Sequence, residues 1–313
     1  MQEHSNNKAL SSTIHCLLFD LGQTLWERDP GDMQQYTVMA DQRVVAILKQ
    51  TFPSEQFPDE VAAVLRTTLL ECFRAEIDKQ PYLEPEGSPM ILKALRALGL
   101  DMLEEGEGHA ERAEHIGQAL FDAMQVGIAQ TRMLFSDALA TLQVIQQRSY
   151  QLGVVTNRYW GGPSFQKDLQ TMGLLTYFDL ANVITSADSH LRKPNPAIFQ
   201  MALDACHVDV AETAMVGDSL IADVAGSQQL GLFAIWKPKN YNEIEAYLEE
   251  KENVSVAEYN RQQVALYAER GSELSSMIYK REDEVSDLVY FATGKIRPQL
   301  IIRDLSELLA WFA

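Results

Sequence analysis

The chain has 313 residues, 46% of them hydrophobic, so it is long enough to bury a large core, and two domains are expected. Its 44 acidic and 26 basic residues give a formal net charge of −18, which would repel nucleic acids and anionic membrane surfaces. No stretch approaches the roughly 18 uncharged apolar residues of a membrane span, and the opening MQEHSNNKALSST is polar where a signal peptide is apolar, so we expect a cytoplasmic protein without a nucleic-acid or membrane partner.

The first predicted element is a short buried strand at residues 14–19, which is apolar apart from His15 and stops at Asp20-Leu21-Gly22. From about Gln34 to Met133, apolar residues recur at helical rather than alternating spacing. Proline and glycine interrupt this pattern at 52–53, 81–89 and 104–108. We therefore expect an all-helical segment after the first strand.

Strands and helices alternate regularly in the second half of the chain. Strands are predicted at 152–156, 182–185, 213–216, 233–235 and 299–302, and helices at 136–147, 164–172, 196–205, 221–230 and 305–312. This alternation is typical of a parallel sheet wrapped by helices. Residues 237–295 interrupt it with a charged segment whose pattern is helical.

The sheet-forming sequence is split, because one strand precedes the helical segment and the others follow it. The predicted fold class is therefore α/β, a doubly wound, Rossmann-like parallel sheet with an inserted all-helical domain. We place the sheet domain at residues 1–25 and 134–313, with a helical insertion at about 237–295, and the inserted domain at residues 26–133.

Polar residues stand at the carboxyl ends of four predicted strands, where ligands bind in an open parallel sheet. Asp20 follows the first strand, Thr156-Asn157 follow the second, Lys193 lies beyond the third, and Gly217-Asp218 with Asp223 follow the fourth. The cysteines and histidines are scattered without the spacing of zinc ligands, so we interpret the cysteines as buried thiols. The candidate site is therefore built from carboxylates, a hydroxyl, an amide and an amine.

These positions resemble the four motifs of the haloacid dehalogenase (HAD) superfamily, which stand here as LLFDLGQTLW, LGVVTN, LRKPNPAIF and VGDSLIADVAG. The resemblance covers residues 14–25 and 136–236, and four motifs in order are far more specific than any one of them. It implies a HAD-like hydrolase core. The helical insertion between the first two motifs resembles the C1-type cap domain, which closes over the active site in that superfamily.

The resemblance also implies roles for the site residues. Asp20 matches the nucleophile that forms an aspartyl-phosphate, which water then hydrolyses, and the backbone carbonyl of Gly22 matches a metal ligand. A carboxylate can attack an anionic phosphoryl group only if the negative charge is neutralised. We therefore expect Asp20, Gly22, Asp218 and Asp223 to bind Mg²⁺, and Thr156, Asn157 and Lys193 to bind a small phosphorylated molecule. The predicted catalytic residues are Asp20, Thr156 and Lys193.

Gly22 departs from the pattern of most phosphatases in the superfamily, which have an aspartate there as general acid. Losing a positioned general acid typically costs about 10²- to 10⁴-fold in rate. The candidates for a substitute acid are Glu27, Asp29, Asp32, His109 and His115. A substrate with a good leaving group, such as an acyl phosphate, would need no acid.

Two other branches of the superfamily also lack this aspartate. The 2-haloacid dehalogenases use no magnesium, whereas GDSLIAD keeps the carboxylates that a metal needs. The phosphonoacetaldehyde hydrolases need a cap lysine for a Schiff base, for which Lys49, Lys79 and Lys93 are the candidates. Nothing in the sequence around these lysines marks one of them as desolvated.

Two functions are therefore compatible with the sequence. The first is a Mg²⁺-dependent phosphohydrolase that acts on a small phosphorylated metabolite through Asp20. The second is a catalytically silent HAD-fold protein that binds a phosphorylated ligand or a protein partner, and its motivation is Gly22 together with the 237–295 segment. Either function is compatible with a homo-oligomer.

Overall fold

The structure is a computed structural model of the chain, and it describes residues 10, 13–29, 31, 33–100, 109–271 and 286–313. None of the described helices is both long enough and apolar enough to cross a bilayer. The cytoplasmic location stays a prediction.

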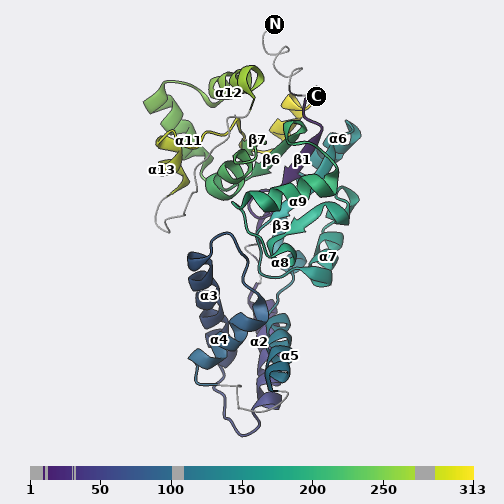
Figure 1. The fold of residues 1–313 in the computed structure, drawn as a ribbon, viewed down its shortest axis with the longest axis vertical. Helices are drawn as coiled ribbons and strands as arrows, with labels where there is room; N and C mark the ends of the chain where they lie inside the picture. Colours follow the sequence, from purple (N-terminus) through teal and green to yellow (C-terminus); the bar gives the residue numbers. More distant parts are fainter. Residues whose placement is uncertain (1–9, 11–12, 30, 32, 101–108, 272–285) are drawn as a thin grey trace.

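A six-stranded parallel sheet lies at the centre of one half of the molecule (Figure 1). Its strands are β1 (Cys16–Phe19), β4 (Gln151–Thr156), β5 (Val183–Thr185), β6 (Thr213–Gly217), β7 (Phe233–Trp236) and β8 (Leu300–Ile301), in the spatial order β5-β4-β1-β6-β7-β8. β1 pairs in parallel with β4 on one side and with β6 on the other. The predicted doubly wound sheet is thus confirmed, and the carboxyl ends of its strands lie along one edge, as ligand sites require.

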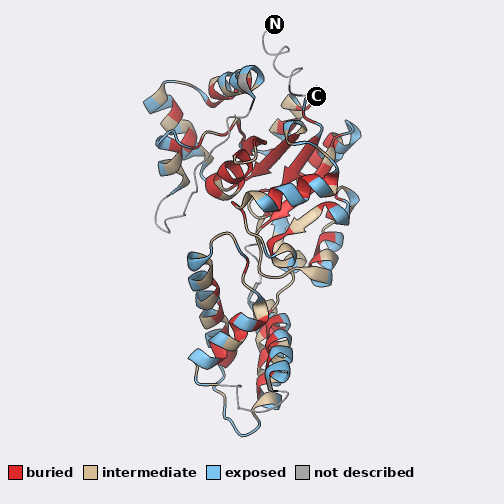
Figure 2. Cartoon of the chain, viewed as in Figure 1, coloured by how far each residue is buried: buried red, intermediate tan, exposed pale blue. Residues whose placement is uncertain are grey.

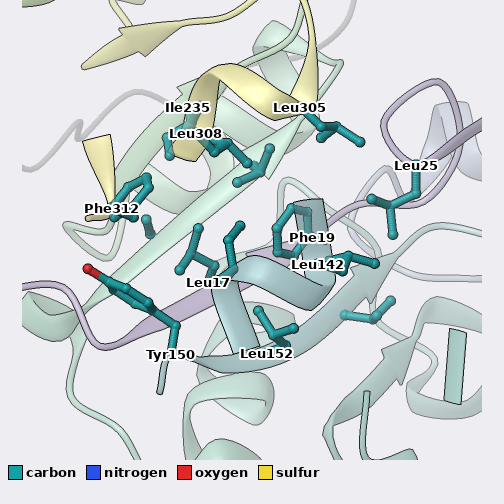
Figure 3. Packing of buried hydrophobic residues seen from close by; sticks show 14 of the residues in the cluster. Leu17, Phe19, Leu25, Leu142, Tyr150, Leu152, Ile235, Leu305, Leu308 and Phe312 are labelled. Atoms are coloured by element: carbon teal, nitrogen blue, oxygen red, sulfur yellow. The ribbon is translucent and has the colours of Figure 1, made fainter. Parts of the chain in front are cut away.

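Both faces of the sheet are buried, because helices cover each of them. Successive residues of a strand point to opposite faces, so each strand contributes side chains to both sides. Leu17 and Phe19 of β1 pack among residues of α6 (Ala138–Gln147), α7 (Gly162–Thr171) and α14 (Leu308–Trp311), and Figure 3 shows part of this cluster. Cys16 and Leu18 face the other side, where α9 (Pro196–Cys206) packs. The strands are accordingly buried throughout the centre of the sheet (Figure 2), which explains the continuous apolar sequence of β1.

Four helices form a separate bundle that lies apart from the sheet (Figure 1). They are α2 (Met33–Thr51), α3 (Val61–Lys79), α4 (Gly87–Ala97) and α5 (His109–Ala123), and we refer to them as the cap. The cap buries an apolar core of its own, which includes Leu65, Phe73 and Leu120. The predicted break at 52–53 falls between α2 and α3. The break predicted at 81–89 falls between α3 and α4 up to residue 86, whereas residues 87–89 form the first turn of α4, and the break at 104–108 lies outside the described residues.

The two chain segments between the sheet and the cap pair as a short antiparallel ribbon. It consists of β2 (Trp26–Arg28) and β3 (Arg132–Leu134), and apart from Leu134 it lies within residues 26–133, where an all-helical domain was predicted. The ribbon was not predicted, because strands of three residues are too short to show an alternating pattern. Next to it, the Asp168 carboxylate of α7 accepts a hydrogen bond from the Ile128 N–H at 2.7 Å.

Residues 237–295, whose sequence pattern predicted helices, are largely helical where the structure describes them, and these helices pack on the sheet. The helices are α11 (Tyr241–Tyr247), η6 (Leu248–Glu252), α12 (Val256–Arg270) and α13 (Asp287–Ala292). Phe291 packs against Trp236 of β7, and the Asn260 side chain exchanges two hydrogen bonds of 2.8 Å with the backbone of Ile301 in β8. These helices therefore complete the core over the β7–β8 end of the sheet.

Shorter elements connect the strands and helices. They are η1 (Ile128–Gln130), η2 (Leu174–Thr176), η3 (Leu180–Asn182), α8 (Ser186–Ser189), η4 (Val210–Glu212), η5 (Leu220–Ala225), α10 (Gly226–Gln228) and η7 (Leu305–Glu307). The helix predicted at 221–230 is formed by η5, a π-helix, and α10. Single-turn π-helices are rare and often occur at functional sites.

Candidate active site

Asp20 lies directly after β1, at the point where the strand order of the sheet reverses. Its backbone N–H extends the pairing with β6 by donating to the Val216 carbonyl at 2.9 Å. Its side chain is buried, Oδ1 lies 2.7 Å from the Lys193 ammonium, and Oδ2 lies 3.5 Å from the Thr24 hydroxyl. The sheet thus fixes the carboxylate within an enclosed polar site.

The ammonium of Lys193 donates three hydrogen bonds, which is all that a lysine can make. They reach Asp20 Oδ1 at 2.7 Å, Asp223 Oδ1 at 2.6 Å and the Val155 carbonyl at 2.6 Å. Burial alone would lower the pKa of Lys193, but the two carboxylates outweigh burial and raise this pKa above its ordinary value. The lysine is therefore a fixed positive charge between two acidic side chains.

Asp218 and Asp223 stand on either side of the start of η5, which follows β6. The N–H of Ser219 donates to Asp223 Oδ2 at 2.9 Å and thereby turns this side chain back toward the end of the strand. A Cβ at Gly217 would lie 2.2 Å from the Asp223 carboxyl carbon, so only glycine leaves room there. Asp218 Oδ2 forms an ion pair with Lys239 at 2.8 Å, and the Lys239 side chain is 58% exposed.

The three carboxylates are close enough to share a metal ion. One oxygen each from Asp20, Asp218 and Asp223 lie within 4.8 Å of one another, and all three side chains are buried. Burial, together with the charge of Asp20, raises the pKa of Asp218 to about 6. Burial also raises the pKa of Asp223 to about 7, and the Lys193 ammonium only partly opposes this. The two lysines that pair with the three carboxylates thus do not outweigh the effect of burial on Asp218 and Asp223, and a hard divalent cation with oxygen ligands, such as Mg²⁺, fits the cluster.

Thr156 and Asn157 stand at the end of β4, beside Asp20. The Thr156 side chain is buried at the last position of the strand. The Asn157 side chain exchanges two hydrogen bonds with the backbone of Lys193, because its amide donates to the Lys193 carbonyl at 2.9 Å and its oxygen accepts from the Lys193 N–H at 2.8 Å. Asn157 therefore positions Lys193, and its predicted contact with substrate stays a prediction.

Gly22 lies in the turn between Asp20 and β2. A Cβ built at this position meets no atom within 4 Å, so the space where most phosphatases of the superfamily place the general acid is open. Of the substitute acids, Glu27 is half-buried on β2, and the Asp29 side chain accepts a hydrogen bond from the Gly31 N–H at 2.8 Å. His115 is exposed on α5, while Asp32 and the side chain of His109 lie outside the described residues.

Two lysines that the sequence analysis did not single out also reach this edge. The Lys237 ammonium is buried, lies over the Phe135 ring at 3.8 Å and donates to the Gln23 carbonyl at 3.3 Å. Burial lowers the pKa of Lys237. Lys239 pairs with Asp218 as described above. Both lysines follow β7. The rule that polar residues at the carboxyl ends of parallel strands are candidate ligand-binding residues would therefore have identified them.

Comparisons with known proteins identify the family. A family model described as haloacid dehalogenase-like hydrolase matches residues 14–231. The phosphoserine phosphatase of Thermus thermophilus is 35% identical over 137 residues, which are 44% of this chain and 51% of that enzyme. The glyceraldehyde 3-phosphate phosphatase of Pyrococcus furiosus is 30% identical over 138 residues, which are 44% of this chain and 55% of that enzyme. The chain thus matches about half the length of these relatives.

A solved structure gives a likeness over the whole length. The 2-haloacid dehalogenase from Pseudomonas syringae aligns with 96% of this chain and 100% of its own, with a TM-score of 0.53 and 24% sequence identity. At this identity the likeness supports the fold and says nothing about the reaction.

Proposed function

The chain belongs to the haloacid dehalogenase-like hydrolases, and we propose that it is a Mg²⁺-dependent phosphohydrolase that forms an aspartyl-phosphate at Asp20. The observation that carries this proposal is the convergence of three buried carboxylates and one buried lysine at the ends of β1 and β6. Two relatives are named as phosphatases of small phosphorylated molecules, phosphoserine and glyceraldehyde 3-phosphate, which supports the same class of substrate for this chain.

In the proposed reaction, an Asp20 oxygen attacks the phosphorus atom. The bond between phosphorus and the leaving-group oxygen breaks, and its electron pair departs with that oxygen. Water then attacks the phosphorus of the aspartyl-phosphate, which releases inorganic phosphate and regenerates the Asp20 carboxylate. Lys193, held 2.7 Å from Asp20, and the Thr156 hydroxyl at the neighbouring strand end are the donors for the phosphoryl oxygens.

Asp20, Asp218 and Asp223, with the Gly22 carbonyl, are the residues that would hold the metal ion. When bound, Mg²⁺ supplies positive charge that offsets the repulsion between the carboxylates and the phosphoryl oxygens. The raised pKa values of Asp218 and Asp223 support this assignment, because they reflect carboxylates that burial has left short of positive charge.

Gly22 narrows the substrates that the site can use efficiently. Since no side chain at this position can protonate a departing alkoxide, esters of simple alcohols should react slowly. An acyl phosphate or another mixed anhydride has a leaving group that is stable as an anion, so it needs no acid. We therefore expect such substrates to be preferred over alkyl phosphates.

The exposure of the cap lysines disfavours phosphonate cleavage. A Schiff-base lysine is normally activated by desolvation. Lys79 and Lys93 are 63% and 43% exposed and both pair with Glu76, and Lys49 is exposed on α2. The buried carboxylate cluster disfavours metal-free dehalogenation, because it keeps the oxygen ligands that a metal ion needs, and its three acidic groups outnumber the two lysines that pair with them.

A catalytically silent, phosphate-binding protein is the second candidate function, and Gly22 is the observation that favours it. The test is a turnover screen of acyl phosphates, alkyl and aryl phosphates, phosphonates and haloacids, with and without Mg²⁺. We expect Mg²⁺-dependent release of phosphate that Asp20→Asn abolishes. The matched control is Asp204→Asn, which removes an exposed carboxylate from α9. Absence of phosphate release from every substrate in Mg²⁺ would favour the silent alternative.

A further inference from the structure

The cap contacts the sheet domain, which we call the core from here on, through a short β-bridge next to Lys193. Leu83 of the loop between α3 and α4 pairs with Leu191 of the core in antiparallel fashion. The Glu84 N–H donates to the His190 carbonyl at 3.0 Å, and the Arg192 N–H donates to the Tyr82 carbonyl at 3.0 Å. The bridge thus joins the cap to the residues that immediately precede the catalytic lysine.

A buried ion pair lies at this bridge. Glu84 is 4% exposed, and its Oε2 atom accepts hydrogen bonds from both Arg192 Nη1 and the Ser186 hydroxyl. Glu84 Oε1 is also buried, and it has no hydrogen-bond partner within the described part of the chain. A buried carboxylate with an unsatisfied oxygen is a costly way to hold two domains together, so stability alone does not explain this residue.

A second contact joins the cap to the segment that follows β4. Tyr159 stacks on Phe73 of α3 with ring centroids 4.4 Å apart, and Trp160 stacks on Phe121 of α5 at 4.9 Å. The indole N–H of Trp160 also donates to the Phe121 carbonyl at 3.1 Å. Two aromatic side chains of the core are therefore anchored in the cap.

The two core segments that the cap holds are the ones that carry the phosphate-binding residues. Residues 156–160 include Thr156 and Asn157, and residues 190–193 include Lys193. They are joined by the two hydrogen bonds between the Asn157 side chain and the Lys193 backbone. The Ser186 hydroxyl joins the first segment to Glu84, because it accepts from the Arg158 N–H at 2.8 Å and donates to Glu84 Oε2. Glu84, Ser186, the backbone of Arg158 and the side chain of Asn157 thus connect the cap to Lys193.

The metal-binding residues are held differently. The π-helix η5, which carries Asp223, packs against β6, β7 and α13, all of which belong to the core. The Asp223 side chain accepts a hydrogen bond from the Ser219 N–H of its own turn, and from the phosphate-binding segments it accepts one from Lys193. A change in cap position should therefore affect the phosphate-binding residues more than the metal-binding carboxylates.

We propose that Glu84 is a positioning residue through which the cap holds Arg192, and with it Lys193, in the phosphate-binding arrangement. This inference rests on the function proposed above. Glu84 contacts neither the reacting atoms nor the metal ligands, and acts by keeping the 190–193 segment against the Asn157 side chain.

The test is calorimetric titration of the full-length chain with inorganic phosphate in Mg²⁺, together with titration of Mg²⁺ alone. We expect Glu84→Gln to weaken phosphate binding about 10-fold and to leave Mg²⁺ affinity unchanged. The matched control is Glu86→Gln, which removes an exposed carboxylate two residues away and should bind both ligands as the wild type does. Ser186→Ala, which removes one hydrogen bond to Glu84, should weaken phosphate binding about 3-fold and tests the proposal even if Glu84→Gln does not fold.

Unchanged phosphate affinity in folded Glu84→Gln and in Ser186→Ala would overturn the inference, as would an equal loss of phosphate and Mg²⁺ binding. Lys193→Met separates this failure from a failure of the proposed function. If Lys193→Met weakens phosphate binding while Glu84→Gln does not, only the role of Glu84 is wrong. If Lys193→Met also leaves phosphate binding unchanged, the assignment of the phosphate site itself is wrong.

Discussion

The two halves of the proposed site around Asp20, one for a metal ion and one for phosphate, are held in place by different parts of the molecule. The metal half, Asp218 and Asp223, follows β6 and is fixed by local turns and by the packing of η5 on the sheet. The phosphate half, Thr156, Asn157 and Lys193, lies in two segments that also contact the cap. Ligand sites on rigid elements keep their geometry, whereas sites on loops depend on what packs against those loops. The cap can therefore influence phosphate binding while the metal half stays in place.

Removing Lys193 should have the largest effect, because its ammonium links the two halves. Lys193→Met leaves Asp20 and Asp223 buried without their shared cation, which should cost about 3–5 kcal/mol of unfolding free energy. Turnover should fall about 10³-fold. Because Mg²⁺ also supplies positive charge, it should recover part of the stability but not the activity. Urea unfolding with and without Mg²⁺ measures the change in stability. The control is Lys167→Met, on the exposed side of α7. No recovery in Mg²⁺ would show that the ion does not bind near Asp20.

Supplying the missing acid should raise activity where the site otherwise lacks a proton donor. A Cβ at position 22 meets no atom within 4 Å, and we expect Gly22→Asp to give about a 100-fold increase in kcat/KM for alkyl phosphates. Acyl phosphates should gain little, because their leaving groups need no proton. Gly22→Asn is the control of matched shape without a proton to donate. Equal rates for the two variants would mean that the acid is not what limits turnover.

The dependence of the metal half on pH follows from its raised pKa values. A carboxyl group whose pKa is higher in the folded state stabilises the fold below its unfolded pKa, and this contribution is lost as the pH rises through the folded pKa. For Asp218 and Asp223 the window runs from about pH 4 to the folded values of about 6 and about 7. Because Mg²⁺ competes with protons, its apparent affinity should rise about 100-fold per pH unit below pH 6, where both carboxyl groups must lose a proton, and about 10-fold between pH 6 and 7, where only Asp223 must.

Thermal melting of the chain at pH 5, 6, 7 and 8, with and without Mg²⁺, measures this dependence. The stabilisation by Mg²⁺ should grow with pH, and Asp218→Asn, which cannot titrate, should show a smaller increase. A stabilisation by Mg²⁺ that does not change with pH would contradict the assignment of these carboxylates as ligands.

The smallest expected effect concerns the aromatic anchor of the phosphate half. Trp160→Phe keeps an aromatic ring against Phe121 but removes the hydrogen bond to the Phe121 carbonyl, which is worth about 1 kcal/mol. We expect phosphate binding to weaken by less than 10-fold and Mg²⁺ binding to stay the same. Trp311→Phe, on the C-terminal helix α14, is the control. A loss of Mg²⁺ affinity as large as the loss of phosphate affinity would show that this anchor does not act mainly on the phosphate half.

Most of the sheet could be predicted from sequence, because each strand has a continuous apolar run with a polar residue after it. The strand predicted at 152–156 corresponds to β4, and the one at 213–216 to β6. The β2–β3 ribbon escaped prediction because three-residue strands show no periodicity. The π-helix η5 escaped it because a change from one helical hydrogen-bond pattern to another leaves the apolar spacing nearly the same.

The residues that form the candidate site could be identified from the sequence alone. Four separate motifs identified Asp20, Thr156, Lys193 and Asp218 as candidates, and the structure brings their segments to one edge. This worked because the carboxyl ends of parallel strands meet wherever the strands form one sheet. The absence of an acid at Gly22 was equally visible in the sequence.

Only the tertiary structure decided what holds those side chains in position. Glu84 and Arg192 are 108 positions apart, and Asn157 and Lys193 are 36 apart, so no local pattern connects either pair. Such contacts depend on how a bundle with its own core packs against the ends of a sheet, which is set by the shapes of many side chains together. Local periodicity determines which segments become helices and strands, whereas the pairing of polar groups between them is a property of the folded molecule.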